Sequence, residues 1–374
     1  MKILTIIETV DIESGGGAAE RARQISLQLS RLGHNVEILT TNVKYSDITR
    51  ESLKNLHVTT VRTLSKRFKL PVPRLLLIFH MIKRSDIVHI INHWTILSVI
   101  ASLICKLINK PYVISPLGSM VIFGRSRNLK KLFNLIIGRR VFENASACIL
   151  ATFDEKTDID LLNFKNPPFI HIANGINKND YDEEIPAKDF KIDEGRRFIL
   201  FIGRLNSIKG PDLLSEAFLK IANSYDKLDI VFIGPDEGLR SDIMNAATNL
   251  NMQHRFHFLG YVSQAEKTWL IKKCEFLTIP SRKEAMSIVV LEAGINSKPV
   301  LLTDKCGFNE VESVFGGKVV SANSESLAKG LSNMLSSDND LEKMGANLKN
   351  LVSSSYLWDI SAKKHESLFA EILK

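Results

Sequence analysis

The chain has little cysteine and proline, and no long hydrophobic run, in its 374 residues. Its apolar start, residues 2–7, stops at Glu8, which is too short for a secretory signal peptide and suits a first buried strand. No stretch reaches the roughly 18 apolar residues of a membrane-spanning helix. The few cysteines form no CxxC or Cys/His ligand spacing, which disfavours a disulfide framework or structural metal and favours reduced thiols. These cysteines are Cys105, Cys148, Cys274 and Cys306.

Acidic residues are scarce in the first half of the chain. Residues 1–173 hold 24 Lys and Arg against 13 Asp and Glu, a net charge of +11, whereas residues 174–374 carry a net charge of −3. We therefore expect an acidic partner to meet the first half. The length suits two domains with separate cores, and a composition of 45% hydrophobic and 24% charged residues is that of a soluble globular protein.

Short apolar runs alternate with segments of helical period, which is the pattern of parallel sheets with crossover helices. In the first half, strands are predicted at residues 2–7, 35–40, 87–91, 112–115 and 147–151, and helices at 17–32 and 97–109. In the second half, strands are predicted at 198–202, 229–233, 256–259, 276–279 and 300–303, and helices at 211–224 and 239–250. The polar, aperiodic segment 177–196 predicts a linker. The predicted fold is α/β, with two doubly wound Rossmann-like domains facing across a cleft.

Two glycine-containing segments could bind phosphate. Gly15-Gly16-Gly17 follows the first strand and opens a helix, where backbone amides can approach an anion; a flexible turn is the alternative. In the second half, Gly203 ends a buried strand, Arg204 follows at once, and Lys209 stands five residues later at a helix start. Two fixed cations at a strand end can neutralise the charge that grows on a departing diphosphate. The alternative is a pair of solvated surface cations.

Two glutamates stand on either side of a predicted helix start. Glu284 lies in the loop after strand 276–279, and Glu292 lies in the second turn of an apolar helix that begins near Ile288. Carboxylates accept hydrogen bonds from sugar and ribose hydroxyls, and the loop amides at the helix N-terminus can hold an anion. The apolar neighbours of Glu292 disfavour the alternative, a solvated glutamate on the helix surface.

This arrangement resembles the glutamate–seven residues–glutamate motif of the retaining GT-B glycosyltransferases of glycosyltransferase family 4. Most of the chain carries the resemblance, in the glycine loop and in Asn174-Gly175-Ile176, Gly203-Arg204-Leu205 with Lys209-Gly210, Phe258-Leu259-Gly260-Tyr261-Val262, Lys298-Pro299-Val300 and Tyr356-Leu357-Trp358-Asp359. It implies a hexosyltransferase that retains anomeric configuration. It also implies an acceptor-binding domain at 1–176, a linker at 177–196, a nucleotide-sugar-binding domain at 197–357, and a C-terminal helix at 358–374 that packs back on the first domain.

The resemblance also assigns site residues. Glu284 would contact the donor sugar, Glu292 would bind the ribose, and Arg204 and Lys209 would bind the diphosphate. Relatives often carry histidine at the position of Leu117, where leucine can neither hydrogen-bond nor transfer a proton. His93 is the candidate to replace that histidine as a catalytic group, with a packed or solvated loop histidine as the alternative. The further donor-binding residues are Gly16, Gly17, Asn174, Gly203, Gly260, Tyr261, Ala285, Met286, Ser287 and Ile288.

Other activities and a metal requirement find less support. Asp158-Ile159-Asp160 and Asp338-Asn339-Asp340 have a spacing that can hold a divalent cation, but both lie in polar helical or turn stretches, which favours solvated surface. We expect no obligatory metal or cofactor. The first loop lacks the G-x-G-x-x-G of dinucleotide oxidoreductases. A nucleotide-sugar epimerase, which needs no acceptor, stays open, and so does an inactive nucleotide-sugar-binding subunit because of Leu117.

Two basic stretches predict contact with an anionic membrane. Residues 62–84 hold seven Lys and Arg, residues 125–140 hold six, and neither stretch contains an acid. Leu, Ile and Phe stand between the basic residues, which suits a membrane surface; solvated charges on packed helices are the alternative. Few aromatics could stack on bases, so we expect no nucleic acid partner.

We expect a UDP- or GDP-sugar donor and a saccharide acceptor, linked to prenyl diphosphate, for bacterial-type surface polysaccharide such as lipopolysaccharide. The protein would then be cytoplasmic and peripheral at the inner face of the plasma membrane.

Overall fold

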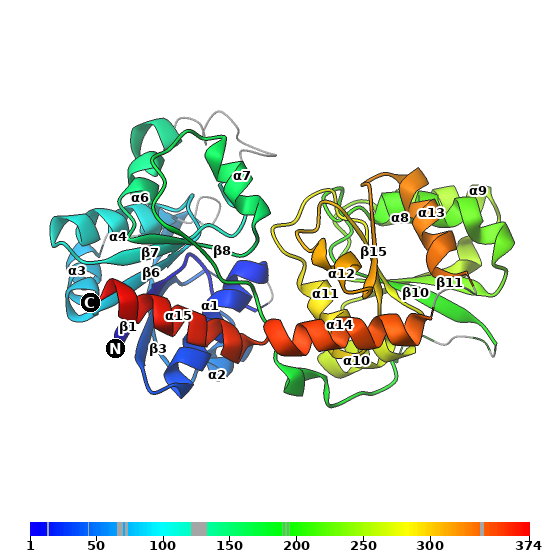
Figure 1. Cartoon of the computed structure of the whole chain (residues 1–374), viewed down its shortest axis with the longest axis horizontal. Coiled ribbons are helices and arrows are strands. Elements are labelled where there is room, and N and C mark those ends of the chain that lie inside the picture. Colours follow the sequence, from blue (N-terminus) through cyan, green and yellow to red (C-terminus); the bar gives the residue numbers. More distant parts are fainter. Residues whose placement is uncertain are drawn as a thin grey trace. The chain divides into compact units, whose positions relative to one another are not determined.

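The chain folds into two compact units in the computed structural model (Figure 1). The structure describes residues 1–12, 15–43, 45–65, 70–71, 74–120, 133–188, 190, 193, 195–336 and 340–374. Unit 1 comprises Met1–Gly175 and Trp358–Lys374, and unit 2 comprises Ile176–Leu357. The segment 177–196, predicted as a linker, therefore belongs to unit 2. Each unit is a parallel sheet covered by helices, which confirms the predicted class of two Rossmann-like domains.

Unit 1 is built on a seven-stranded parallel sheet with the order β3-β2-β1-β6-β7-β8-β9. Its strands are β1 (Lys2–Ile6), β2 (Asn35–Thr41), β3 (His57–Val61), β6 (Ile87–Ile91), β7 (Tyr112–Ser115), β8 (Ala147–Leu150) and β9 (Phe169–His171). The chain runs outward from β1 to β3 and then returns to β6 on the other side of β1. Ligands of open parallel sheets bind at the carboxyl ends of the strands at such a reversal of order. In unit 1 that place lies between β1 and β6.

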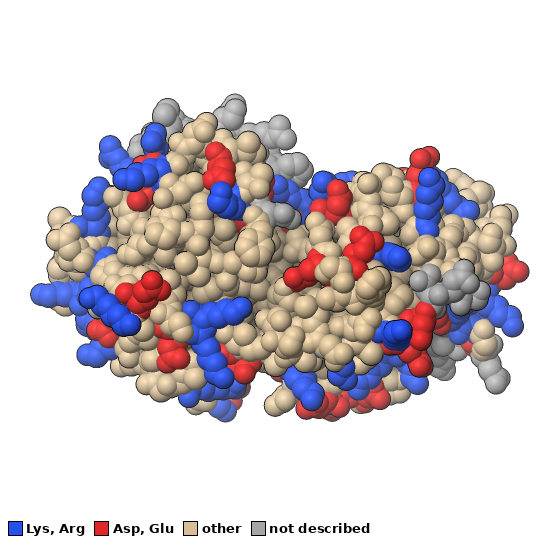
Figure 2. All heavy atoms as spheres, in the orientation of Figure 1, with Lys and Arg blue, Asp and Glu red and all other residues tan. Residues whose placement is uncertain are grey.

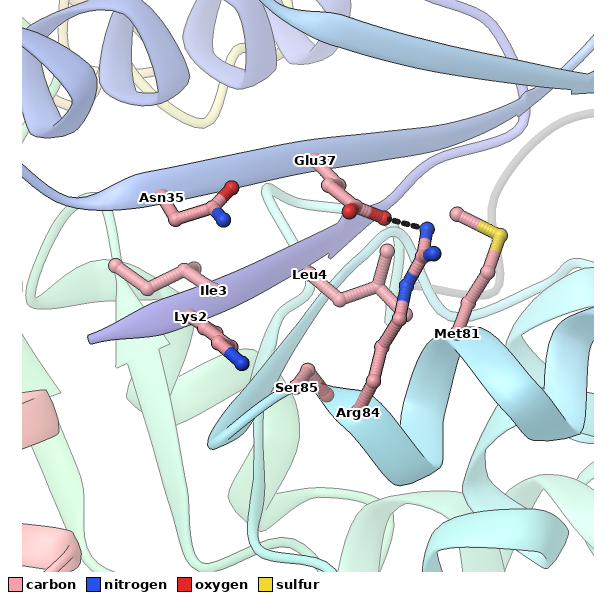
Figure 3. A pocket seen from close by; sticks show the side chains of 8 residues that line it. All are labelled: Lys2, Ile3, Leu4, Asn35, Glu37, Met81, Arg84 and Ser85. Carbon is pink, nitrogen blue, oxygen red and sulfur yellow. Dashed lines mark hydrogen bonds and ion pairs between the residues drawn. The ribbon is translucent and has the colours of Figure 1, made fainter.

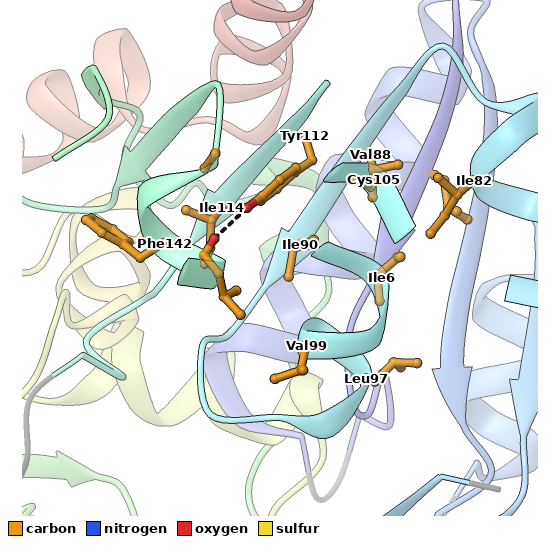
Figure 4. Packing of buried hydrophobic residues seen from close by; sticks show 14 of the residues in the cluster. Ile6, Ile82, Val88, Ile90, Leu97, Val99, Cys105, Tyr112, Ile114 and Phe142 are labelled. Atoms are coloured by element: carbon orange, nitrogen blue, oxygen red, sulfur yellow. Dashed lines mark hydrogen bonds between the residues drawn. The ribbon is translucent and has the colours of Figure 1, made fainter. Parts of the chain in front are cut away.

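Alternate residues of these strands pack against different helices. Leu4 faces the cluster formed with α3 and α4, whereas Ile3 faces α1 and α15. Figure 4 shows the first cluster, where the Tyr112 hydroxyl donates to the Val141 carbonyl at 2.6 Å. The strands read as apolar runs in the sequence because both faces are buried.

The described helices of unit 1 are α1 (Gly16–Arg31), α2 (Asp47–Ser52), α3 (Leu75–Arg84), α4 (Ile96–Leu107), α6 (Arg139–Glu143), α7 (Asp154–Asp160) and α15 (Trp358–Ile372). Unit 1 also has a π-helical turn η1 (Asn134–Gly138) and a short antiparallel pair, β4 (Thr63–Ser65) and β5 (Leu70–Pro71).

Unit 2 is a six-stranded parallel sheet with the order β12-β11-β10-β13-β14-β15. Its strands are β10 (Arg197–Ile202), β11 (Leu228–Ile233), β12 (Phe256–Gly260), β13 (Leu277–Ile279), β14 (Val300–Thr303) and β15 (Gly317–Val320). The order reverses between β10 and β13. Its α-helices are α8 (Pro211–Ile221), α9 (Arg240–Asn249), α10 (Gln264–Lys273), α11 (Ile288–Ile295), α12 (Glu310–Ser313), α13 (Ser324–Met334) and α14 (Leu341–Ser355). The short helical turns are η2 (Lys178–Tyr181), η3 (Ala222–Ser224) and η4 (Gln253–Arg255).

The end of the chain returns to unit 1. Trp358, Leu368 and Phe369 of α15 are buried in one cluster with Ile25 and Leu29 of α1. This packing makes the last helix part of the core that covers one face of the first sheet. No helix in the described part of the chain combines the length and apolarity needed to cross a bilayer. All four cysteines are buried free thiols.

Candidate functional site

The loops after β10 and β13 meet where the strand order of unit 2 reverses. Residues 203–210 follow β10, and residues 280–287 follow β13. The Arg282 backbone N–H donates to the Ile208 carbonyl at 2.8 Å, so the two loops are joined by their backbones. The predicted residues Arg204, Lys209 and Glu284 all lie on these loops. Folding thus brings them to the edge where parallel sheets bind ligands.

Lys209 and Glu284 form an ion pair between the two loops. Nζ of Lys209 lies 2.9 Å from Oε1 of Glu284, and the Ser281 hydroxyl donates to the same oxygen. The Glu284 backbone N–H donates to the Lys305 carbonyl at 2.8 Å, which joins this loop to the turn after β14. The side chains of Lys209 and Glu284 are 24% and 11% exposed, so the pair is held firmly and still reached by solvent. No described residue donates a hydrogen bond to Oε2 of Glu284.

Gly210 allows the close approach of these loops. It is the N-cap of α8 with φ of +70°, a conformation that favours glycine. A Cβ at this position would lie 2.2 Å from the Pro280 carbonyl oxygen. Only glycine therefore fits between the two loops without displacing the backbone.

Arg204 is held on the same loop by a different acid. Its Nη1 lies 3.1 Å from Oε1 of Glu237, in the loop after β11. Asn206 donates to Oε2 of Glu237 at 2.6 Å, and its own Oδ1 accepts the Lys209 backbone N–H at 3.0 Å. The hydrogen bond from Asn206, with a further contribution from Arg204, holds the pKa of Glu237 below its ordinary value. The Arg204 side chain is 55% exposed, so its guanidinium is oriented and open to a ligand.

Glu292 lies on α11 and is 7% exposed. Its Oε1 accepts from the Tyr181 hydroxyl at 2.9 Å and lies 2.7 Å from Nζ of Lys267. Burial, followed by the nearby Glu292 charge, raises the pKa of Tyr181 well above its usual range. No described residue donates to Oε2 of Glu292. Both predicted glutamates are thus anchored through one oxygen, although the structure places them in separate hydrogen-bonded clusters on either side of the α11 start.

The N-terminus of α11 lies between these two glutamates in the chain. Its N-cap, Ser287, makes no side-chain capping bond, and its buried hydroxyl has no hydrogen-bond partner. Met286 is buried, while Ala285 and Ile288 are half-buried. In the turn after β14, Oδ1 of Asp304 is also buried without a partner. The helix dipole and uncapped amides give this loop a partial positive charge.

The remaining predicted residues of unit 2 lie at the ends of neighbouring strands. The Gly203 N–H donates to the Ile233 carbonyl at 2.9 Å, and the Gly234 N–H donates to the Gly260 carbonyl at 2.8 Å. Gly260 ends β12 with φ of +65°, and the next side chain, Tyr261, is 87% exposed. An exposed phenol ring at a strand end can stack on a planar base.

The glycine loop of unit 1 leads directly into α1. Gly15 donates its N–H to the Asp11 carbonyl at 3.0 Å, and α1 begins at Gly16 and continues through Gly17. Gly16 has φ of +60°, and a Cβ there would face open space. Asn174 points inward instead: its Oδ1 accepts from Nη1 of Arg21 at 2.9 Å, and Asn174 is 7% exposed.

His93 is packed inside unit 1. The side chain is fully buried, its Nε2 lies 3.1 Å from Oδ1 of Asn134, and its ring meets Trp94 and Phe133 edge-on. Burial lowers the pKa of His93 to about 4, so the ring is neutral at physiological pH. In this structure His93 is therefore the packed histidine that was the alternative to a catalytic group. Leu117, with φ of +52°, packs against an apolar cluster near α1.

Neither Asp-x-Asp sequence forms a cation site among the residues that the structure describes. Asp160 lies at the end of α7, 2.8 Å from Nζ of Lys156. Asp340 caps α14, and residues 338–339 lie outside the described part of the chain. Within the described ranges, no group of three or more His, Cys, Asp or Glu side chains could hold a metal ion.

A small cavity of about 220 Å³ lies elsewhere in unit 1 (Figure 3). Lys2 and Asn35, at the amino ends of β1 and β2, line it, and Arg84 pairs with Glu37 across it. Because it lies at the amino ends of these strands, it is separate from the edge where the order of the sheet reverses. We assign it no part in the candidate site.

Several partners in the candidate site were not predicted. Glu237 holds Arg204, Asn206 holds the Lys209 backbone, and Tyr181 and Lys267 hold Glu292. Glu237 stands in the polar turn 235–238 directly after a buried strand, a position that could have marked it. No sequence feature marked Tyr181 or Lys267, because their contacts with Glu292 depend on how η2 and α10 pack beside α11.

Two family models match the chain, one in each half. Residues 15–180 match the model described as Glycosyltransferase Family 4, and residues 182–351 match the model described as Glycosyl transferases group 1. An uncharacterised glycosyltransferase of Methanocaldococcus jannaschii is 26% identical over 376 residues, covering 95% of this chain and 94% of that protein. A D-inositol 3-phosphate glycosyltransferase of Corynebacterium diphtheriae is 22% identical over 254 residues, covering 63% of this chain and 58% of that protein.

Solved glycosyltransferase structures share the fold. HepE of Anabaena in complex with UDP matches with a TM-score of 0.78 at 17% identity, covering 99% of this chain and 100% of that chain. WaaG, a glycosyltransferase involved in lipopolysaccharide biosynthesis, matches with a TM-score of 0.72 at 19% identity, covering 98% and 99%. Because glycosyltransferase models match both halves and the two sheets have the fold of these solved structures, the chain is a glycosyltransferase of the GT-B type.

Proposed function

We propose that the protein transfers a hexose-type sugar from a nucleoside-diphosphate sugar to a saccharide acceptor, with retention of configuration and without an obligatory metal. The observation that carries the proposal is the Lys209–Glu284 pair, fixed at the reversal of the unit 2 sheet with Arg204 on the same loop. Two cations and a carboxylate at a sheet edge suit a diphosphate joined to a sugar. The residues below are assigned on this basis.

Arg204 and Lys209 bind the donor diphosphate in this proposal. Both cations are oriented by acids, Glu237 and Glu284, and keep donors for phosphate oxygens. Negative charge grows on the diphosphate as the sugar bond breaks, so contacts already in place favour the transition state over the ground state. One contact of this kind is worth about 3 kcal/mol of the barrier. The uncapped start of α11 adds favourable potential for the same anion.

The two glutamates bind hydroxyl groups of the donor. Because contacts within the protein engage Oε1 of each carboxylate, Oε2 is the oxygen offered to a ligand. Glu284 accepts from the sugar and Glu292 accepts from the ribose, while Tyr261 lies near the base. A buried carboxylate left without its hydroxyl partner is costly, which makes such contacts selective.

Attack occurs on the face of the sugar that the diphosphate leaves. His93 is buried and neutral, and Glu284 is tied to Lys209 and Ser281, so we assign no protein nucleophile. The departing phosphate then accepts the proton of the acceptor hydroxyl while the new bond forms on the same face. Arg204 and Lys209 hold that phosphate in position.

The donor and acceptor classes draw support from named relatives. HepE structures contain UDP, UDP with glucose, and UDP-glucose, which supports a UDP-sugar, with GDP-sugars as the second class to test. WaaG is involved in lipopolysaccharide biosynthesis, which supports a lipid-linked saccharide acceptor for surface polysaccharide. We propose a cytoplasmic protein that acts at the inner membrane face, with a prenyl-diphosphate-linked saccharide as acceptor.

The test is a donor screen followed by a transfer assay. UDP-, GDP- and ADP-sugars are screened by thermal shift, and the best binder is incubated with a prenyl-diphosphate-linked saccharide, with and without EDTA. We expect product whose new linkage keeps the donor configuration, unaffected by EDTA. Arg204→Ala and Lys209→Ala should lower the rate by about 100-fold or more, whereas Lys349→Ala, on the exposed side of α14, should not. Donor consumption without any acceptor would favour an epimerase, and wild-type activity in the site variants would contradict the proposal.

We also propose that unit 1 docks on an anionic membrane through α3 and α4. These helices pack together and expose large apolar side chains. Leu75 and Leu76 of α3 are 52% and 77% exposed, and Leu103 and Leu107 of α4 are 47% and 78% exposed. Leucines at this density on neighbouring helices exceed the scattered apolar exposure of an ordinary surface.

The charge around this apolar surface is mainly basic. Residues 87–142 contain eight Lys and Arg and no Asp or Glu. Figure 2 shows basic side chains on this part of unit 1. Arg74, Lys83 and Lys106 are exposed. Each basic residue near an anionic surface contributes about 1 kcal/mol, so a few suffice for reversible binding. Residues 66–69 and 125–132, predicted for the same contact, lie outside the described part of the chain.

Vesicle sedimentation at low salt tests this docking. Wild-type protein should bind vesicles rich in phosphatidylglycerol and should be released by high salt. Leu103→Ser/Leu107→Ser should lose most of the bound fraction, whereas Leu250→Ser, which changes a leucine of unit 2 that is 53% exposed, should not. Equal binding to neutral and anionic vesicles, or no binding to anionic vesicles, would contradict the proposed membrane contact. The proposal for the donor site would still stand.

A further inference from the structure

A buried carboxylate of unit 1 joins two loops at the carboxyl ends of neighbouring strands. Glu155 stands in the first turn of α7 and is 4% exposed. Its Oε2 accepts the Ala151 backbone N–H at 2.6 Å, in the loop after β8. Its Oε1 accepts the Gly118 backbone N–H, in the loop after β7. One side chain thus fixes both loops at once.

The backbone that Glu155 holds is in an uncommon conformation. Leu117 and Gly118 have φ of +52° and +73°, two consecutive residues in the left-handed region. A leucine in this region is strained and keeps the conformation only when its surroundings enforce it. A hydrogen bond from a backbone N–H to an ionised carboxylate is about twice as strong as a neutral one and can supply that restraint.

The turn held in this way supports the loop at the reversal of the unit 1 sheet. Ser119 follows Gly118, and its hydroxyl accepts the His93 backbone N–H at 3.3 Å. Its carbonyl accepts the indole N–H of Trp94. Residues 92–94 follow β6, one of the two strands between which the order reverses. A continuous set of contacts therefore leads from Glu155 to the edge where unit 1 would bind a ligand.

Glu155 has an electrostatic partner that is also buried. Arg21 of α1 is fully buried and donates to Asn174 and to the Ile172 carbonyl. Burial raises the pKa of Glu155, while its backbone hydrogen bonds and the Arg21 charge act in the opposite direction. Two buried opposite charges give little net stability, because the cost of desolvation offsets their attraction. The attraction to Arg21 alone is therefore a weak explanation for this carboxylate.

We propose that Glu155 is a positioning residue for sugar transfer, which fixes the 116–118 turn and, through Ser119, the 92–94 loop. The kinetic part of this inference rests on the proposed function. Both carboxylate oxygens of Glu155 are taken by backbone N–H groups, and the charged residues proposed to bind the donor lie in unit 2. Its loss should therefore lower kcat and leave the KM for the donor almost unchanged.

The experiment compares Glu155→Gln with the double variant Arg21→Met/Glu155→Gln. The oxygen of the glutamine carboxamide can accept only one of the two backbone N–H groups, because its NH₂ group then faces the other N–H. One of the two loops is therefore released. We expect amide hydrogen exchange at residues 117–119 to rise about tenfold in Glu155→Gln. We expect kcat to fall about 100-fold, with a donor KM within about threefold of wild type. The double variant removes both buried charges and should regain melting temperature without regaining slow exchange or kcat.

Glu143→Gln is the matched control. Glu143 also accepts a backbone N–H, from Lys165 at 2.7 Å, but it belongs to α6 and its other bond is to Arg139 of the same helix. The control should keep the wild-type kcat and the slow exchange at residues 117–119. Unchanged exchange in Glu155→Gln, or kcat restored in the double variant, would overturn the inference and leave Glu155 as a charge balance for Arg21. A wild-type protein without transfer activity would defeat the proposed function, whereas the exchange measurement would still test the position of the turn.

Discussion

Two pairs of charged residues at the candidate site of unit 2 each join two loops. Lys209 meets Glu284, and Arg204 meets Glu237, with Asn206 between the two pairs. Such pairs at a protein surface add little stability, because solvent screens them and two long side chains lose freedom. Their physical effect is to hold charge in a fixed place. That is the property a site needs when it must respond to charge developing on a substrate.

Glu284→Gln tests this view at a single residue. The substitution keeps the shape of the side chain and removes the charge opposite Lys209. We expect transfer to fall by about 100-fold or more, with a melting temperature close to that of wild type. Glu342→Gln, on the exposed side of α14, is the control and should keep full activity. A Glu284→Gln enzyme that turns over at the wild-type rate would remove this residue from the site.

Buried histidines in unit 1 make its stability depend on pH. Burial lowers the pKa of His89 to about 3 and of His93 to about 4, and burial and Arg21 lower that of His365 well below its usual value. In the unfolded chain these histidine rings become protonated near pH 6.5, whereas in the folded chain they stay neutral to a lower pH. Their contribution is therefore complete above pH 6.5 and is lost as the pH falls toward the folded-state values.

Each of these histidines should cost up to about 1.4 kcal/mol of stability per pH unit below pH 6.5. Urea unfolding between pH 7 and pH 5 measures this slope. His365→Gln should reduce the slope, whereas His254→Gln, at an exposed position, should leave it unchanged. A stability that does not vary between pH 7 and pH 5 would contradict the buried, neutral state of these rings.

The sequence predicted the charged residues of the site better than their partners. Arg204, Lys209 and Glu284 could be placed because each follows a recognisable buried strand, and parallel strands end at one edge. Glu155 and Arg21 could not be found in this way. A glutamate in a polar helical stretch and an arginine among the alanines of α1 look like surface residues until the fold buries them.

In the two large sheets, the strands that escaped prediction lie at edges, although the edge strand β12 was predicted. β3, β9 and β15 are all edge strands, and none was predicted. Central strands are buried on both faces and read as apolar runs, as in the Phe-Ile-Leu-Phe-Ile sequence of β10. An edge strand such as β3, with the sequence His-Val-Thr-Thr-Val, is only partly buried and lacks this signal. Its pairing with β2 decides its structure.

Gly210→Ala tests the contact between the β10 and β13 loops. A methyl group 2.2 Å from the Pro280 oxygen forces the backbones apart, in addition to the strain of a non-glycine residue at φ of +70°. We expect a loss of about 2–4 kcal/mol in unfolding free energy and weaker donor binding. Gly195→Ala shares a similar φ of +77° but faces open space, so it should cost only about 1 kcal/mol. Equal losses for both variants would refute a steric role for Gly210.

Packing of α15 is tested by Phe369→Ala. The ring of Phe369 is fully buried in the cluster that α15 forms with α1. Removing a buried ring leaves a cavity, and we expect a loss of about 3–5 kcal/mol in the unfolding free energy of unit 1. Leu373→Ala, at a residue that is 38% exposed, should cost far less. Chemical denaturation of the full chain measures both, and a small loss for Phe369→Ala would show that α15 contributes little to this core.

At the scale of the whole molecule, two sheets of the same type carry different surfaces. Unit 2 gathers cations and carboxylates at its reversal point, whereas unit 1 carries the basic excess of the chain and the exposed leucines of α3 and α4. The last helix returns to unit 1, so the two ends of the chain belong to one unit. This division of surfaces is the basis for assigning donor binding to unit 2 and the membrane contact to unit 1.

Calorimetric titration of the intact chain with nucleoside-diphosphate sugars tests the central claim most directly. We predict that one donor class binds, and that its Kd rises at least about tenfold in Lys209→Ala and in Arg204→Ala but stays unchanged in Lys349→Ala. A donor that binds all three variants as tightly as it binds the wild type would contradict the account.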